Sequence, residues 1–245
     1  MALAKRESLD TLPIGEIIAR IGQTFVGNPY VPGTLEAEGP EKLVVNLRTF
    51  DCVTFVENTL ALARTIKARG DYARYKAELA HIRYRGGRMD GYPSRLHYFS
   101  DWIADNESKG VVRNLTRELG GIADPEPITF MTSHTDAYRQ LKDTALVSEI
   151  RSAEARLTAA GRLVIPEDSI EGISDLIRNG DVIAAATNVK GLDIAHTGIA
   201  LWVDGTLRLM HAPLVGSTVQ ISPNTLAGRI KASGSQDGIM VARPR

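Results

Sequence analysis

Two strand-like stretches flank an Asp-Gly pair near the C-terminus, and together they restrict the fold more than any other part of the sequence does. They read HTGIALWV and TLRLMHAP, from residue 196 to 203 and from residue 206 to 213. Asp204-Gly205 between them is a dipeptide that favours a two-residue hairpin turn. A third strand-like stretch, GDVIAAAT, ends upstream at Thr187. The sequence therefore predicts an antiparallel sheet in this region.

Helical patterns precede these strands. Isoleucines recur at helical spacing over residues 13–26. From Cys52 onward polar residues recur at helical spacing and apolar residues fill the remaining arc, which predicts a largely buried helix. Asp51 is suited to cap the start of this helix, and Gly70 is suited to end it in the left-handed conformation.

Two further helices are predicted, around residues 71–82 and over residues 136–160, the second with little role beyond packing. Helices followed by an antiparallel sheet are typical of the α+β class. Because no stretch reads as a linker, we expect residues 1–245 to form a single domain with helical insertions.

Composition excludes several classes of function. The 29 basic and 29 acidic residues cancel, so no net field attracts nucleic acid or an anionic membrane. No stretch approaches the roughly 18 apolar residues of a membrane span, and no export signal is visible. We therefore expect a soluble chain, and leave open that an export signal has been removed. The oligomeric state is not predictable from these features.

The single cysteine, Cys52, rules out an internal disulfide framework and a cysteine-rich zinc module. Its position at a helix start exposes the sulfur to the helix dipole and to unpaired N–H groups, which favour the thiolate. Taken alone, a cysteine in such a position is more often a small buried hydrophobe than a reactive thiol.

Two histidines of the hairpin supply a candidate base and an orienting group. If Asp204-Gly205 is the turn, opposite residues have numbers that sum to 409, so Gly198 faces His211. His196 lies two residues from Gly198 and therefore on the same face of the sheet as His211. A cysteine thiolate needs such a base and a third group to orient it. The same three side chains also offer zinc its ligands, although no close-spaced ligand pair is present.

Several blocks of the sequence resemble a known family. The DC pair opening a helix, the GDV strand and the run HTGIALWVDGTLRLMHA resemble the NlpC-type, papain-like cell-wall hydrolases. The blocks PYVPGTLE, LVVNLRTFDCVTFVENTLALA, YRGGRMDGYPSRLHYFSDWI and KGLDIAHTGIAL resemble one branch, the N-acetylmuramoyl-L-alanine amidase-like proteins of the domain of unknown function 1460. The resemblance implies a papain-like NlpC-type fold with helices packed on a central antiparallel sheet.

The resemblance also implies roles for single residues. Cys52 is the implied nucleophile at its helix N-terminus, His196 the general base and His211 the residue that orients it. Tyr30 matches an upstream tyrosine that borders the site. No cofactor or metal is implied.

The implied substrate is peptidoglycan stem peptide or a muropeptide, cut between N-acetylmuramic acid and L-alanine. The superfamily's commoner activity, a γ-D-glutamyl-diaminopimelate endopeptidase, is the alternative, together with acyl transfer or a non-catalytic or metal-binding module. Because stem peptides carry carboxylates, Arg48 and Arg85 are candidate substrate contacts, and Asp90 is a candidate partner for a free amine. Asp51 completes the candidate substrate-binding set. The resemblance implies a place in the cell envelope or periplasm, and a cytoplasmic recycling role stays open.

Overall fold

A computed structural model describes residues 2–215 and 217–245 of the chain. Its α-helices are α1 (Ala2–Arg6), α2 (Ile14–Gln23), α3 (Cys52–Lys67), α4 (Tyr72–Arg83), α5 (Phe99–Ser108), α6 (Phe130–Ser133), α7 (Thr144–Ala160) and α8 (Leu226–Lys231). Its strands are β1 (Val112–Asn114), β2 (Ile122–Asp124), β3 (Arg162–Pro166), β4 (Val182–Thr187), β5 (Ile194–Val203), β6 (Thr206–His211), β7 (Gln220–Ile221) and β8 (Gln236–Pro244). Short 3₁₀ turns are η1 (Leu9–Thr11), η2 (Arg85–Gly87), η3 (Tyr92–Ser94), η4 (Thr135–Ala137), η5 (Arg139–Lys142), η6 (Glu167–Ser169) and η7 (Glu171–Leu176).

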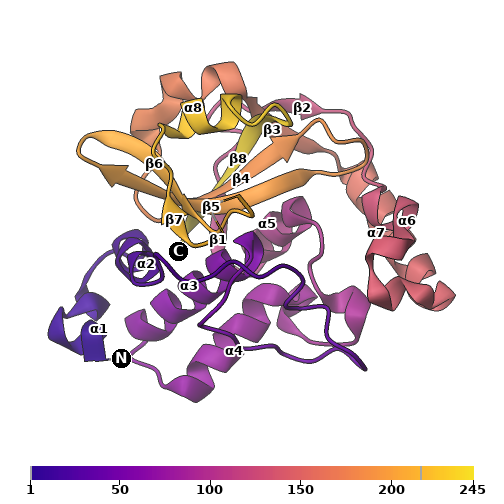
Figure 1. The fold of residues 1–245 in the computed structure, drawn as a ribbon, viewed down its shortest axis with the longest axis horizontal. Helices are drawn as coiled ribbons and strands as arrows, with labels where there is room; N and C mark the ends of the chain where they lie inside the picture. The colour runs from indigo at the N-terminus through magenta and orange to yellow at the C-terminus, as the bar shows by residue number, and fades with distance from the viewer. Residues whose placement is uncertain (1, 216) are drawn as a thin grey trace.

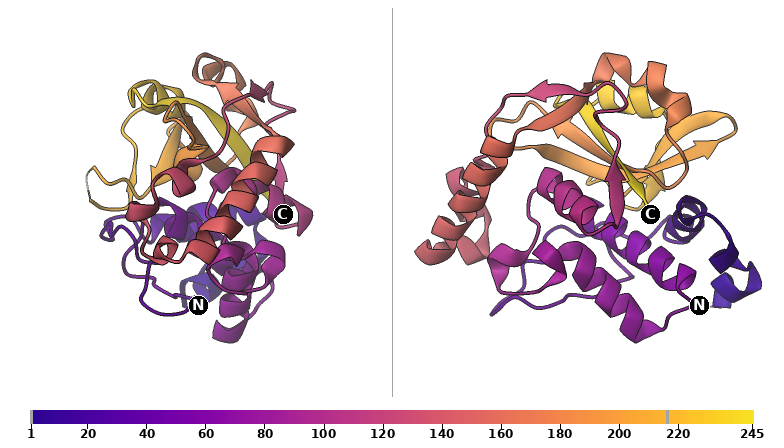
Figure 2. Two further views of the ribbon diagram at one scale, coloured as in Figure 1. Left: turned by 90° about the vertical axis from the view of Figure 1, so that its right-hand side faces the viewer. Right: turned by 180° about the vertical axis from the view of Figure 1, so that it is seen from behind.

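The strands form one sheet in the order β2-β3-β8-β4-β5-β6-β7, and β1 pairs with β8 off this path. Every pairing between these strands is antiparallel. Helices α2 to α5 form a layer under one face of the sheet, and α8 lies over the other face (Figure 1). Figure 2 shows the same two-sided arrangement from behind, with α6 and α7 at one side of the sheet. The α+β prediction is confirmed.

Strand β4 shows how the sheet is buried on both faces. Its six residues are all buried. Val182, Ala184 and Ala186 pack into the cluster that includes α2, α3 and α5, whereas Ile183 and Ala185 pack into the cluster that includes α8. Because side chains alternate along a strand, an uninterrupted apolar stretch is what such a position requires.

The predicted hairpin is confirmed in type and register. Asp204 and Gly205 both have positive φ, 48° and 73°, as a type I′ turn needs. Val203 is the partner of Thr206, and Ile199 is the partner of Met210. The register on which the placement of the two histidines depends is therefore the observed one.

Helix α3 is largely buried, as predicted, but it ends differently. The helix runs from Cys52 to Lys67, and the residue with left-handed φ just after it is Arg69, at 53°, rather than Gly70. Gly70 is needed for a different reason, because a Cβ there would lie 2.6 Å from the Arg74 side chain. The prediction that Gly70 supplies the left-handed residue was wrong, and the helix itself ends earlier, at Lys67.

Other predicted helix and sheet boundaries also differ from the observed ones. The helix predicted over 136–160 begins only at Thr144, after two short 3₁₀ turns, and the helix predicted over 13–26 runs from Ile14 to Gln23. Strands β1 to β3 lie before the predicted sheet region, and β7 and β8 lie after it. No helix in the described part of the chain is long and apolar enough to cross a membrane.

A buried ion pair ties α3 to α4 and to the segment before the cysteine. Arg83 Nε lies 2.7 Å from Glu57 Oε2, and both side chains are 1% exposed. Arg83 Nη1 also donates to Val44 O at 2.7 Å. The pair thus helps to position the chain that leads into Cys52.

Replacing Arg83 by Met is expected to lower the free energy of unfolding by about 3–5 kcal/mol, because Glu57 is left buried without its partner. Denaturant unfolding measures this change. The matched control is Arg139→Met, which removes an exposed pair with Glu38 and should cost at most about 1 kcal/mol. Equal effects of the two substitutions would contradict the prediction.

Candidate active site

Cys52 is the first residue of α3, and a capping box fixes this helix start. The Asp51 carboxylate accepts the Thr54 N–H at 2.7 Å, and the Thr54 hydroxyl accepts the Asp51 N–H at 2.9 Å. Among the described residues, no residue other than Cys52 itself accepts a hydrogen bond from the backbone N–H groups of Cys52 and Val53. These two donors point to the neighbourhood of the sulfur, as first-turn N–H groups do.

The start of α3 abuts strand β5, which brings the sulfur to a small cavity. Cys52 is half-buried, and the backbone of Thr197 in β5 is close enough to act on its pKa, which it lowers. The cavity has a volume of about 170 Å³. It is lined by Cys52, Val53, His97, Tyr98, Phe99, Met131, Tyr138, Leu192, Asp193, Ile194, Ala195, His196 and Thr197.

His196 and His211 contact each other, as the strand register predicted. His196 Nε2 lies 2.7 Å from His211 Nδ1, and the ring centroids are 4.9 Å apart at 81°. His211 Nε2 is buried without a partner among the described residues. One proton lies in this bond, so when His196 Nε2–H donates, His196 Nδ1 keeps a free lone pair.

Burial controls the protonation of the three side chains. It raises the pKa of the Cys52 thiol to about 12, and the Asp51 carboxylate adds to the rise. Burial also lowers the pKa of His196 well below its ordinary value, and His211 and Arg229 act in the same direction. Burial and Arg229 lower the pKa of His211 to about 3.

These shifts favour a neutral thiol beside neutral imidazoles. The N–H groups at the helix start do lower the pKa of Cys52, as the sequence indicated, but the loss of solvation outweighs them. A resting thiolate, which the helix position alone favours, is not what the surroundings of Cys52 support.

Tyr30 lies beside the cysteine, on the segment predicted to border the site. Its N–H donates to Ser217 O at 2.7 Å, and it forms an isolated bridge with Phe50 next to the helix start. Burial raises the pKa of Tyr30, and the charges of Cys52 and Asp51 raise it further. The phenol thus belongs to the electrostatic neighbourhood of the sulfur.

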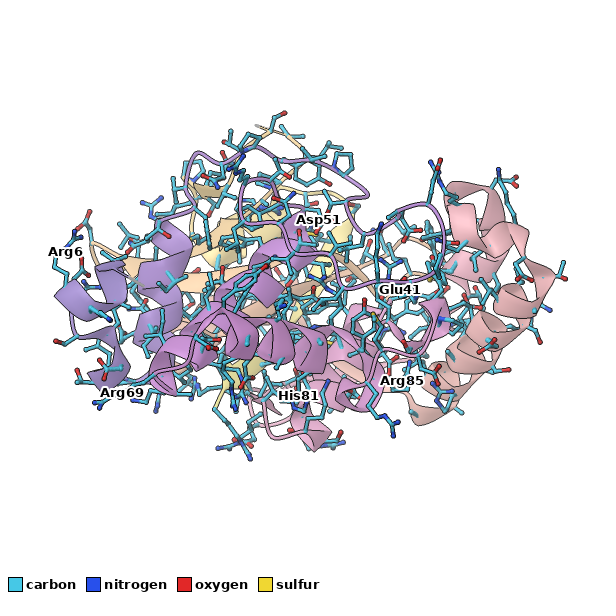
Figure 3. The ribbon with its side chains drawn as sticks, turned by 90° about the horizontal axis from the view of Figure 1, so that it is seen from below. Arg6, Glu41, Asp51, Arg69, His81 and Arg85 are labelled. Carbon is cyan, nitrogen blue, oxygen red and sulfur yellow. The ribbon has the colours of Figure 1, made fainter. Side chains whose placement is uncertain are left out.

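The other candidate substrate-binding residues do not line this cavity. Arg85 makes a two-bond ion pair with Asp101, at 3.0 and 2.6 Å, and Figure 3 shows it well away from Asp51. Arg48 and Asp90 are exposed on loops. The Asp51 carboxylate serves as the helix cap. Substrate contacts by these four residues stay predictions.

Several lining residues carried no role in the sequence analysis. His97 and Tyr98 come from the YPSRLHYFSDW block, Asp193 comes from the KGLDIAH block, and Tyr138 lies between η4 and η5. The first three lie in the blocks that carry the family resemblance, which was the available signal. Tyr138 lies in a region assigned to packing alone, and nothing in the sequence pattern marks it.

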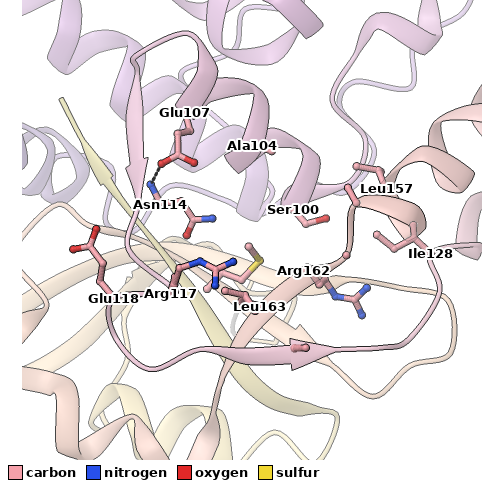
Figure 4. A pocket seen from close by; sticks show the side chains of 14 residues that line it. Ser100, Ala104, Glu107, Asn114, Arg117, Glu118, Ile128, Leu157, Arg162 and Leu163 are labelled. Atoms are coloured by element: carbon pink, nitrogen blue, oxygen red, sulfur yellow. Dashed lines mark hydrogen bonds between the residues drawn. The ribbon is translucent and has the colours of Figure 1, made fainter.

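Two further features bear on what the site can do. Among residues 2–215 and 217–245, no three His, Cys, Asp or Glu side chains are arranged to hold a metal ion. A larger cavity of about 580 Å³ lies beside α5. Ser100 of α5 and Arg162 and Leu163 of β3 form part of its wall (Figure 4). No cysteine or histidine lines it, whereas Cys52 and His196 both line the smaller cavity.

Comparison with known proteins gives a consistent result. A family model described as AmiA-like, N-acetylmuramoyl-L-alanine amidase-like, matches residues 20–236. The crystal structure of an N-acetylmuramoyl-L-alanine amidase from Bacteroides uniformis is 35% identical, with a TM-score of 0.90 over 95% of this chain and 99% of that one. A Bacteroides fragilis protein with a proposed xylanase activity is 35% identical, with a TM-score of 0.87 over 92% and 99% of the two chains.

A Legionella pneumophila protein of family DUF1460 shares the fold, at 22% identity and a TM-score of 0.71 over 97% of this chain and 91% of that one. No curated protein matches the sequence. The family model spans most of the chain, and the site described above lies within the matched residues. The chain belongs to the AmiA-like family of N-acetylmuramoyl-L-alanine amidase-like proteins.

Proposed function

We propose that this chain is a cysteine amidase that hydrolyses the amide bond between N-acetylmuramic acid, or its anhydro form, and L-alanine. The observation that carries the proposal is the cavity that Cys52 and His196 line together, with His196 hydrogen-bonded to His211. Family membership and the 35% identical amidase support peptidoglycan or its fragments as the substrate class.

In the proposed first step, the Cys52 thiol gives its proton to His196 Nδ1 as the sulfur attacks the amide carbonyl carbon. The carbonyl π electrons move to oxygen. The N–H groups of Cys52 and Val53 are available to that oxyanion, and the Tyr30 hydroxyl is nearby. One such donor typically contributes about 10²–10³ in rate.

The tetrahedral intermediate then collapses. His196 returns the proton to the amide nitrogen, the C–N bond breaks, and the amine of L-alanine leaves while a thioester remains. Water next attacks the thioester with His196 as its base, which releases the muramyl carboxylate and restores the thiol. Atoms and charges balance with water as the only co-reactant.

His211 is proposed to set the tautomer of His196. When His196 Nε2–H donates to His211 Nδ1, the lone pair of His196 is left on Nδ1, the nitrogen that is free to take the thiol proton. A neutral His211 serves this purpose, and burial keeps its pKa low. His211 therefore acts by orientation and does not itself exchange protons with the substrate.

The proposal also covers the wider setting of the enzyme. Its site is of the NlpC-type, papain-like kind, with the nucleophile at a helix N-terminus, and residues 1–245 act as one catalytic domain. Because the substrate is cell-wall material, we propose that it works in the cell envelope or periplasm. Fractionation of native cells tests this, and a wholly cytoplasmic protein would instead fit recycling of released muropeptides.

The xylanase activity proposed for one relative does not suit this cavity. Glycoside hydrolysis needs two carboxyl groups on either side of the scissile bond. Asp193 is the one carboxylate among the described lining residues, and its two oxygens already accept the N–H groups of Ser100 and Ile194. The arrangement favours acyl transfer by the cysteine.

A mass-spectrometric digest of purified muropeptides tests the proposal. The expected products are the free sugar and an intact stem peptide that begins with L-alanine. Release of a peptide that starts at diaminopimelate, with L-alanyl-γ-D-glutamate left on the sugar, would replace the proposal with the endopeptidase. No cleavage of any muropeptide would refute both activities.

A further inference from the structure

His97 lines the same cavity as Cys52 and His196, and its tautomer is fixed by its surroundings. His97 Nε2 lies 2.9 Å from Tyr92 O. A carbonyl oxygen only accepts, so Nε2 carries the proton and Nδ1 carries the lone pair. The ring also packs on the Tyr92 ring, with centroids 4.3 Å apart. The side chain is thus held in one orientation.

The free nitrogen of His97 is open. Nδ1 has no partner in the described part of the chain, yet it is not sealed off, in contrast to His211 Nε2, which is buried and unpaired. Burial, reinforced by Arg95, lowers the pKa of His97 to about 3. Both effects favour the neutral ring, in which Nδ1 is a hydrogen-bond acceptor.

Most other polar side chains in the cavity are already occupied. The Tyr98 hydroxyl donates to a buried glutamate and accepts a backbone N–H. The Thr197 hydroxyl donates to a backbone carbonyl at 2.9 Å. Both Asp193 oxygens accept backbone N–H groups. His97 Nδ1 is therefore an acceptor without a hydrogen-bond partner among the described residues, on a side chain that lines the same cavity as Cys52 and His196.

We propose that His97 Nδ1 accepts a hydrogen bond from an amide N–H of the bound stem peptide, an inference that rests on the proposed function. The fitting donor is the N–H that joins the first and second stem residues. It lies one residue from the scissile bond and is not itself broken, and the mainly apolar lining around Cys52 suits the alanine methyl group. His97 is thus a residue that determines specificity by selecting a peptide N–H.

Two substitutions at His97 separate its two hydrogen bonds. In His97→Gln the side-chain amide reaches the Nε2 position and keeps the donation to Tyr92 O, but the Nδ1 acceptor is lost. In His97→Asn an acceptor near the Nδ1 position remains, while the bond to Tyr92 is lost. Thermal melts of both variants identify any general loss of folding.

Binding is measured in the Cys52→Ala background by calorimetry with N-acetylmuramoyl-L-alanyl-D-isoglutamine. A second probe is the analogue in which an ester oxygen replaces the N–H between the two residues. His97→Gln is expected to weaken binding of the amide by about 3- to 10-fold, the effect of one hydrogen bond to a neutral acceptor. His97→Gln should bind the ester as tightly as the protein with His97 does. His97→Asn should retain most of the affinity for the amide.

The outcomes distinguish this inference from the proposed function. If the amide and the ester lose affinity equally in His97→Gln, or neither does, the inference is overturned, since a merely structural role does not discriminate them. The same follows if neither probe binds the Cys52→Ala protein. If the binding pattern is as expected but the wild-type protein cleaves no muropeptide, recognition by His97 stands and the amidase proposal fails.

Discussion

The Cys52→Ala protein is expected to release stem peptide at least about 10⁴-fold more slowly than the wild-type protein, because removing a covalent nucleophile leaves only binding and oxyanion stabilisation. The substitution removes one sulfur at a half-buried position, so the fold is retained. The N–H groups of Cys52 and Val53 that are proposed to hold the oxyanion also remain. The measurement is kcat/KM for release of the intact stem, with muropeptide binding as a check on the variant.

Two controls make the result specific. Because Cys52 is the single cysteine of the chain, loss of the thiol is verified directly by counting alkylated sites in the unfolded protein. The Cys52→Ser variant keeps the shape but has a weaker nucleophile, so it should also be severely impaired. Activity of Cys52→Ala within tenfold of wild type would refute covalent catalysis, and its loss on treatment with chelators would point to a metal-bound water.

The parts of the site that the sequence predicts are those whose geometry depends on turns and caps formed by residues close together in the chain. A two-residue turn fixes the strand register, and the register fixes which side chains share a face, so His196 and His211 could be paired from numbering alone. The cap by Asp51 fixes the start of α3 at Cys52 in the same way. In both cases the signal lies in a short continuous stretch of sequence around the group in question.

The parts that the sequence does not predict depend on packing between distant segments. β8 pairs with both β3 and β4 in the middle of the sheet, although it is the last strand in the chain and no turn links it to either neighbour. The lining of the Cys52 cavity brings together His97, Tyr138 and Asp193 from three separate segments. No spacing rule relates such residues, so only the folded chain shows that they meet.

The protonation of Cys52 illustrates the same limit in electrostatics. Its helix position predicts a lowered pKa, and that influence is present. Desolvation by the strand and loops packed around the sulfur has a larger effect on the pKa than the helix does. Those neighbours lie far from Cys52 in the sequence, so its local pattern does not indicate them. The sequence thus indicated the contribution of the helix but not the larger opposing contribution of burial, which changes the expected pH behaviour of Cys52.

His196→Ala is expected to lower kcat/KM near neutral pH by about 10²–10⁴-fold, the usual contribution of general acid–base catalysis. The wild-type protein should lose activity only at pH values below the ordinary pKa of histidine. Burial lowers the pKa of His196, so this side chain stays a neutral base down to lower pH. The His196→Ala protein must rely on free thiolate. Because burial raises the pKa of Cys52 to about 12, its residual rate should climb about tenfold per pH unit through the alkaline range. Parallel profiles of kcat/KM against pH for the two proteins test this, and a residual rate that stays flat would show that His196 is not the base that takes the thiol proton.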